Sequence, residues 1–196
     1  MAIKPILFNT EMVRAILDGR KTCTRRIMKP QLTAHYGTQY IKPPYGPGDI
    51  LYVRETWKKA PNGYYYYEDW QRNDIADVTK WKPSIHMPKE AARIWLKVTD
   101  VRVERLQGIK EDGVWDEGFR FKPPCLTRVS ADGHTCDLDG PCTSSIKYCD
   151  MTMGELFGKE LWDSTIKKSD LGRYGWQANP WVWVIEFERC EKPIDA

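Results

Sequence analysis

Long apolar runs are missing from this 196-residue sequence. No stretch approaches the roughly 18 consecutive apolar residues that a transmembrane helix requires. The N-terminal residues MAIKPILFNT lack the long apolar segment and the small-residue cleavage site of a signal peptide. We therefore expect no membrane association and a cytoplasmic location, where thiols are reduced or metal-bound instead of paired.

A strong net charge is missing too. The 30 Lys and Arg residues and 27 Asp and Glu residues give a formal charge of +3 at pH 7. This small positive charge slightly favours anionic partners, but it is not by itself the signature of a nucleic-acid-binding domain. Aromatic residues, by contrast, are abundant, with nine Trp and ten Tyr. Such rings suit a β-rich core, and they also suit stacking on nucleobases.

The sequence has no internal repeat, and its length fits a single domain, residues 1–196. Patterns of apolar and aromatic residues predict strands at 4–9, 50–57, 64–70, 93–106 and 181–189. The alternation breaks near Thr99 and Asp100, which indicates a β-bulge. Helical patterns lie between Thr10 and Gly19 and at 110–118 and 160–168. Many strands with few short helices predict a β-barrel-like α+β fold.

Residues 123–150 have little apolar content and no periodicity, so we interpret them as a loop inserted into the domain. Four of the six cysteines lie in this loop: Cys125, Cys136, Cys142 and Cys149. Four thiolates can close a tetrahedral structural zinc site, and a metal can fold a polar loop that has no core. The usual C-x2-C pairs are missing, so a structural zinc, free thiols and disulfides all stay open. An H-E-x-x-H pattern is missing as well, which argues against a catalytic metal.

The segment GRKTCTRR, residues 19–26, places four cationic side chains beside two threonines and a cysteine. It follows the first predicted helix, and a helix C-terminus favours cations by itself. The segment is therefore either a solvated turn or a pocket that holds a polar or anionic ligand. If the chain is extended from Arg20 to Ile27, two faces result. Lys21, Cys23 and Arg25 share one, and Thr22, Thr24 and Arg26 share the other.

Further candidate ligand contacts lie outside this segment. Arg54, Glu55 and Trp57 end the predicted strand 50–57, and His86 lies in the Pro-bounded loop PSIHMP. Glu55 either pairs with a nearby arginine or points into a cavity. The tyrosine run at 64–67 is either packing on an edge strand or a stacking platform.

The stretches AILDGRKTCTRR, GDILYVRETW, PSIHMP and NPWVWVIEF resemble the ASCH-domain family, which belongs to the PUA-like superfamily of small β-barrels. The layout is similar to ASCH proteins of bacteriophages and prophages, which would act inside a bacterial host cell. The resemblance covers residues 4–122 and 156–190 and leaves the cysteine-rich loop unexplained. It implies a mixed β-barrel with short flanking helices. It also implies a pocket beside the first helix that accepts a nucleobase or nucleoside, often on RNA.

One bacterial branch of that family has a similar GRKTxTxR segment and hydrolyses the amide of N4-acetylcytidine. The resemblance to this branch implies that Lys21 is a base, Thr24 a nucleophile and Glu117 the carboxylate that moves the proton. Arg26 also matches the segment of that branch. The remaining candidate ligand contacts are Arg20, Thr22, Arg54, Glu55, Trp57 and His86.

These residues are sufficient for catalysis and equally sufficient for binding. A threonine hydroxyl needs a nearby base, and a lysine is a base only when burial or neighbouring cations lower its pKa. The same cations hold phosphate in a binder, while an aromatic side chain stacks on the base. Three hypotheses therefore stay open: an amidohydrolase for acylated cytidine, a non-catalytic reader of RNA or modified DNA, and a phage-type interaction protein. The proposed chemistry requires no cofactor, and the expected partner is a nucleoside or a nucleic acid, RNA before DNA.

Overall fold

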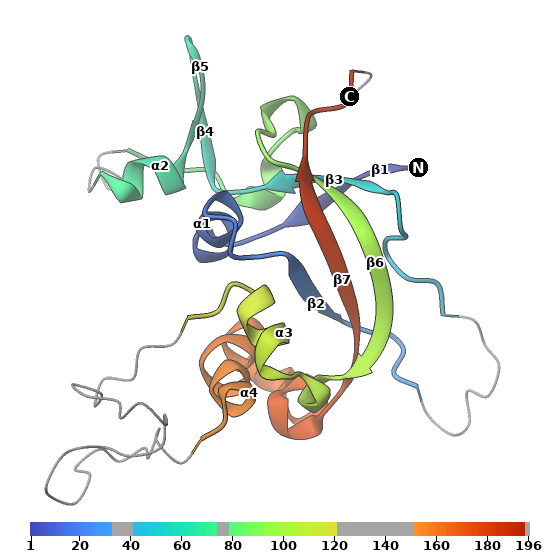
Figure 1. Ribbon diagram of the computed structural model, residues 1–196. Coiled ribbons are helices and arrows are strands. Elements are labelled where there is room, and N and C mark those ends of the chain that lie inside the picture. The colour runs from blue at the N-terminus through green and yellow to red at the C-terminus, as the bar shows by residue number, and fades with distance from the viewer. Residues whose placement is uncertain (33–40, 74–78, 121–150, 195–196) are drawn as a thin grey trace, which may run out of the picture.

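A five-stranded mixed sheet forms the centre of the computed structural model, which describes residues 1–32, 41–73, 79–120 and 151–194. The strand order is β1-β3-β6-β7-β2 (Figure 1). The strands are β1 (Ile3–Leu7), β2 (Cys23–Ile27), β3 (Ile50–Arg54), β6 (Trp95–Arg105) and β7 (Trp181–Cys190). β1 and β3 run parallel, and the other neighbouring strands are antiparallel.

Short helices and a separate two-stranded ribbon complete an α+β fold, the predicted class. The helices are α1 (Thr10–Leu17), α2 (Tyr67–Arg72), α3 (Glu111–Asp116), α4 (Met153–Leu156) and α5 (Leu171–Tyr174). A wide π turn spans Phe157–Trp162, and 3-10 turns span Ser84–His86, Lys89–Ala91, Leu106–Gly108, Asp163–Thr165, Lys168–Asp170 and Trp176–Ala178. β4 (Trp57–Ala60) and β5 (Gly63–Tyr66) form a ribbon that projects from the main sheet (Figure 1). Within the described ranges, no helix is long and apolar enough to cross a bilayer.

The strands β6 and β7 curve along their length (Figure 1). In the described part of the chain, backbone pairing ends at β1 and β2, the two edges of the sheet. A side chain joins these edges, because the Arg26 guanidinium on β2 donates to the Leu7 carbonyl on β1 at 3.1 Å. The strand pairing therefore describes a curved mixed sheet, and closure into a barrel stays a prediction.

The predicted β-bulge is confirmed, because the pairing of β6 with β7 shifts register between Val98 and Asp100. The predicted strand 64–70 is wrong in its second half, where α2 begins at Tyr67. Glu68 and Asp69 lie in the first turn of α2, where the helix dipole favours acidic residues. This local signal for a helix start overrides the β propensity of the tyrosine run.

The helical segment predicted at 160–168 begins earlier, with α4 and the π turn that follows it. Gly158 lies in that wide turn, where a Cβ atom would come within 2.1 Å of the Trp176 ring. The turn is therefore shaped by a ring that packs against the backbone, a contact that helical periodicity does not encode.

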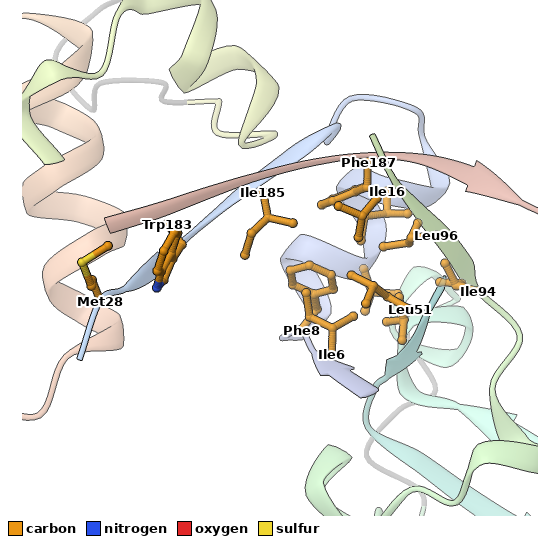
Figure 2. Close-up of a cluster of buried hydrophobic side chains, with 13 residues drawn as sticks. Ile6, Phe8, Ile16, Met28, Leu51, Ile94, Leu96, Trp183, Ile185 and Phe187 are labelled. Atoms are coloured by element: carbon orange, nitrogen blue, oxygen red, sulfur yellow. The ribbon is translucent and has the colours of Figure 1, made fainter. Parts of the chain in front are cut away.

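The main hydrophobic core lies where α1 packs against the central sheet (Figure 2). Its fully buried members include Val13 and Ile16 of α1 and Leu51, Leu96 and Ile185 of the strands. A second cluster joins alternate residues of β7 to α3, α4 and the π turn, and a third lies beneath the ribbon around Trp57. Strand β7 therefore buries both of its faces, which is why almost its whole first half is apolar.

Two neighbouring residues of β1 test this core. Ile6 is 1% exposed and Leu7 is 43% exposed. We expect Ile6→Ala to lower the free energy of unfolding by about 2–5 kcal/mol, because it leaves a cavity in the core. Leu7→Ala is the matched control and should change that free energy by less than about 0.5–1 kcal/mol. Urea unfolding followed by tryptophan fluorescence measures both, and equal losses would contradict this assignment of the core.

Candidate functional site

The segment 19–26 is placed by the end of α1. Asn9 caps the helix, because its side chain accepts from the Met12 amide at 2.9 Å. At the other end Gly19 adopts φ +72°, as expected for the residue that follows a helix. The Lys21 amide then donates to the Ala15 carbonyl at 3.0 Å. The chain thereby turns from the helix directly into β2.

The end of α3 lies against this turn. The Thr22 amide donates to the Asp116 carbonyl at 2.8 Å, and Lys21 and Glu117 form an isolated β-bridge. Gly118 makes this approach possible, because a Cβ at this position would lie 2.6 Å from the Ala15 Cβ. Its φ of +76° also favours glycine.

Glu117 binds two cations of the segment 19–26. The Lys21 ammonium donates to Glu117 Oε2 at 2.6 Å, and it also reaches the Glu117 carbonyl at 3.0 Å and the Cys23 carbonyl at 2.7 Å. The Arg25 guanidinium donates to Glu117 Oε1 at 3.3 Å. All three side chains are buried. The predicted face of Lys21, Cys23 and Arg25 therefore converges on one carboxylate from α3.

Burial sets the protonation of this cluster. It lowers the pKa of the Lys21 ammonium from its ordinary value, and the Glu117 carboxylate opposes that shift. Burial also raises the pKa of the Cys23 thiol to about 12, and the negative charge of Glu117 adds to the effect. Cys23 therefore stays a neutral thiol at physiological pH, and its role in the cluster is packing.

The opposite face of β2 carries Thr24 and Arg26. The Arg26 guanidinium donates to Thr24 Oγ1 at 2.9 Å. It also lies 5.3 Å from the centroid of the Phe8 ring, and the Lys21 ammonium lies 5.5 Å from the same ring. Phe8 is thus a shared neighbour of two cations of the segment, and sequence reasoning did not single it out.

A pocket of about 340 Å³ lies beside α1. Its lining consists of Glu11, Met12, Ala15, Arg20, Glu117, Gly118, Phe119, Arg120 and Leu161. Arg20 is held there by the Gly118 carbonyl at 3.0 Å and by the Asp18 carboxylate at 3.0 Å. The volume lies at the lower end of the range for small-molecule sites, about 300–1,000 Å³.

A smaller cavity of about 30 Å³ adjoins it, because both share Met12, Glu117 and Leu161 in their walls. Arg25 lines the smaller cavity, and its Nε has no hydrogen-bond partner in the described structure. Glu117 is therefore the catalytic candidate that lines the pocket. Lys21, which bonds to Glu117, is 3% exposed, and Thr24, on the opposite face of β2, is 1% exposed.

The other candidate residues lie in different surroundings. Thr22 is exposed and donates to the Asp116 carboxylate at 3.3 Å. Glu55 is buried and accepts two hydrogen bonds of 3.0 Å from Arg93. Of the two predicted alternatives for Glu55, the structure shows the pair with an arginine. Arg54 donates to the Met87 carbonyl at 2.7 Å.

Trp57 and His86 complete this second group. Trp57 is buried in the third hydrophobic cluster, and His86 is exposed at the end of a 3-10 turn. Arg54 ends β3, Glu55 follows it and Trp57 begins β4, whereas Thr22 bonds to Asp116 of α3, beside the Glu117 cluster. The cysteines predicted as zinc ligands, Cys125, Cys136, Cys142 and Cys149, lie outside the described residues.

Comparison with known proteins yields only distant likenesses. No protein-family model and no curated protein matches the chain. The hypothetical protein PH0355 has a similar solved structure, with 14% identity and a TM-score of 0.39 over 97% of this chain and 100% of its own. An ASCH domain from Lactobacillus crispatus JV V101 has 12% identity and a TM-score of 0.38 over 96% of this chain and 79% of its own. Neither likeness assigns a function to this chain.

The Glu117 cluster predicts a specific loss of stability. Glu117→Ala should lower the free energy of unfolding by about 3–5 kcal/mol, because it leaves two buried cations without their carboxylate. Glu111→Ala, in the first turn of the same helix and exposed, should cost less than about 1 kcal/mol. Urea unfolding of both variants makes the comparison. Similar losses in the two would show that the buried cluster does not stabilise the fold.

Proposed function

We propose that this chain binds a cytosine-type nucleobase or nucleoside in the pocket beside α1. The observation that carries the proposal is Glu117, which lines the pocket and whose carboxylate is fixed by Lys21 and Arg25. A fixed, largely desolvated carboxylate is a strong and selective acceptor, because an ionised carboxylate can only accept hydrogen bonds.

The chemistry of that acceptor selects among bases. A carboxylate accepts from the exocyclic amine of cytosine, whereas uracil presents an acceptor oxygen at the same position and would be repelled. Arg20 and Arg120 offer donors at the same pocket for carbonyl oxygens or phosphate, and Phe119 offers an apolar ring. The resemblance of the segment 19–26 to ASCH-domain proteins, with their PUA-like barrels and base-binding pockets, supports the same assignment.

A second candidate function is hydrolysis of N4-acetylcytidine, favoured by the 2.6 Å contact between the Lys21 ammonium and Glu117. Lys21 would first pass a proton to Glu117 across this contact. Neutral Lys21 would then take the Thr24 hydroxyl proton as Thr24 attacks the acetyl carbon. The C–N bond would then break, with Glu117 passing a proton to the departing amine, and water would release acetate from the threonine ester. The low exposure of Thr24 requires the side chains in front of it to move when substrate binds.

One assay separates these functions. Purified protein is incubated with N4-acetylcytidine and the products are resolved by chromatography, while calorimetric titration measures binding. A hydrolase releases cytidine and acetate, loses turnover completely in Thr24→Val, and loses about 10²-fold or more in Glu117→Gln. A binder shows no turnover, but its affinity falls about tenfold or more in Glu117→Gln, because the charged acceptor is lost.

The matched control is Glu111→Gln, an exposed residue of the same helix, which should leave turnover and affinity unchanged. If the wild type shows no turnover of N4-acetylcytidine and no saturable binding of cytidine or N4-acetylcytidine, both proposed functions are overturned. The interaction-protein hypothesis would then gain support.

A further inference from the structure

The β4–β5 ribbon presents one face to the body of the protein and the other away from it. Trp57 and Tyr66 are opposite each other in the ribbon and belong to the third hydrophobic cluster. Tyr66 also donates its hydroxyl to the Ala91 carbonyl at 2.7 Å. Lys58 and Tyr65 form the adjacent pair, so their side chains leave from the other face.

Tyr65 begins a chain of four aromatic rings. Its ring centroid lies 5.9 Å from that of Trp70, which lies 5.5 Å from that of Trp81, which in turn lies 5.4 Å from that of Tyr67. Each contact is edge-to-face, at 79–90°. All four rings are only partly buried, and none belongs to the three hydrophobic clusters. Partly exposed ring surface therefore continues from the ribbon across α2 to Trp81.

Lysines accompany these rings. Lys59, Lys80 and Lys82 are exposed, and Lys58 is half-buried beside the Thr79 hydroxyl. In the part of the chain that the structure describes, none of the four has a carboxylate partner. The nearby acids are engaged elsewhere, because Glu68 binds Arg14 and Asp69 binds Arg93. Among the described residues of this region, four lysines therefore stay without a carboxylate beside the partly exposed rings.

We propose that the aromatic–lysine surface, formed by these four rings and four lysines, binds single-stranded nucleic acid. Exposed rings stack on unpaired bases without regard to sequence, and lysines neutralise phosphates along the backbone. An apolar protein partner would match the rings without the cations, and an acidic partner would match the cations without the rings. Lys58 lies on the Tyr65 face of the ribbon, and Lys59 and Lys82 lie over the Tyr64 and Trp57 rings on its other face. The surface is separate from the pocket and uses different side chains.

The aromatic–lysine surface extends the proposed ligand from a nucleoside to a polymer. This extension rests on the proposed function of the pocket. Helix α1 links the two sites, because Arg14 bonds to Glu68 of α2 while Met12 and Ala15 line the pocket. A strand with one base in the pocket can therefore follow α1 onto the rings. Both features then act on one ligand.

The test measures fluorescence anisotropy of a labelled 12-nucleotide oligouridine, which the pocket disfavours. The double variant Lys80→Glu, Lys82→Glu should weaken binding at least about tenfold at low salt. It should also reduce the slope of log affinity against log salt by about 1.4, because two phosphate contacts are lost. The matched control, Lys167→Glu with Lys168→Glu, changes the charge equally at two exposed lysines far from the ribbon in sequence. It should change the affinity less than about threefold.

Two further arms make the result decisive. Trp81→Leu, checked for folding by urea unfolding, should weaken oligouridine binding about tenfold, whereas wild-type protein should bind a duplex of equal length less tightly. If Trp81→Leu unfolds, the lysine pairs and the duplex carry the test. Any of three results would overturn the proposed surface. The two lysine double variants could lose equal affinity for oligouridine, the wild type could bind duplex and oligouridine equally tightly, or the wild type could fail to bind oligouridine. Titration with cytidine then tells separately whether the pocket has failed as well.

Discussion

The buried carboxylate of Glu117 is the interaction on which the arrangement of the site depends. Lys21 and Arg25 are removed from water beside it, and each cation would be costly to bury alone. The carboxylate compensates both, and in doing so it fixes the end of α3 against the turn that leaves α1. Gly118 lets the backbones meet closely enough for this pairing. One side chain thereby joins the end of α3 to the turn between α1 and β2, which lies 96 positions earlier at Lys21.

The same residue lines the pocket, so in this proposal stability and ligand binding draw on one side chain. Lys21 and Arg25 hold its carboxylate oxygens in place, which reduces the reorganisation needed when a ligand donates to them. Arg25 adds an Nε donor beside the smaller cavity. A donor and an acceptor fixed side by side suit an amide-like edge, the kind that a cytosine ring presents.

Local features of this chain were predictable, whereas the long-range partners were not. The two faces of residues 20–27, the glycine after α1 and the bulge in β6 follow from periodicity and backbone conformation, which are local properties. The pairing of Arg25 with Glu117 joins residues 92 positions apart, and nothing in either neighbourhood encodes it. The strand predicted at 64–70 was wrong beyond Tyr66 for a related reason, since a helix start within the run outweighs β propensity. Glu55 could be assigned to its pair only once Arg93 was placed.

The most direct test of this account is calorimetric titration of the full-length protein with cytidine and with uridine under identical conditions. The two nucleosides differ at the position that would face Glu117, where cytidine donates and uridine accepts. The account predicts that cytidine binds at least about tenfold more tightly, a difference of about 1.4 kcal/mol. Equal affinities, or tighter binding of uridine, would contradict the assignment of Glu117 as the group that recognises the ligand.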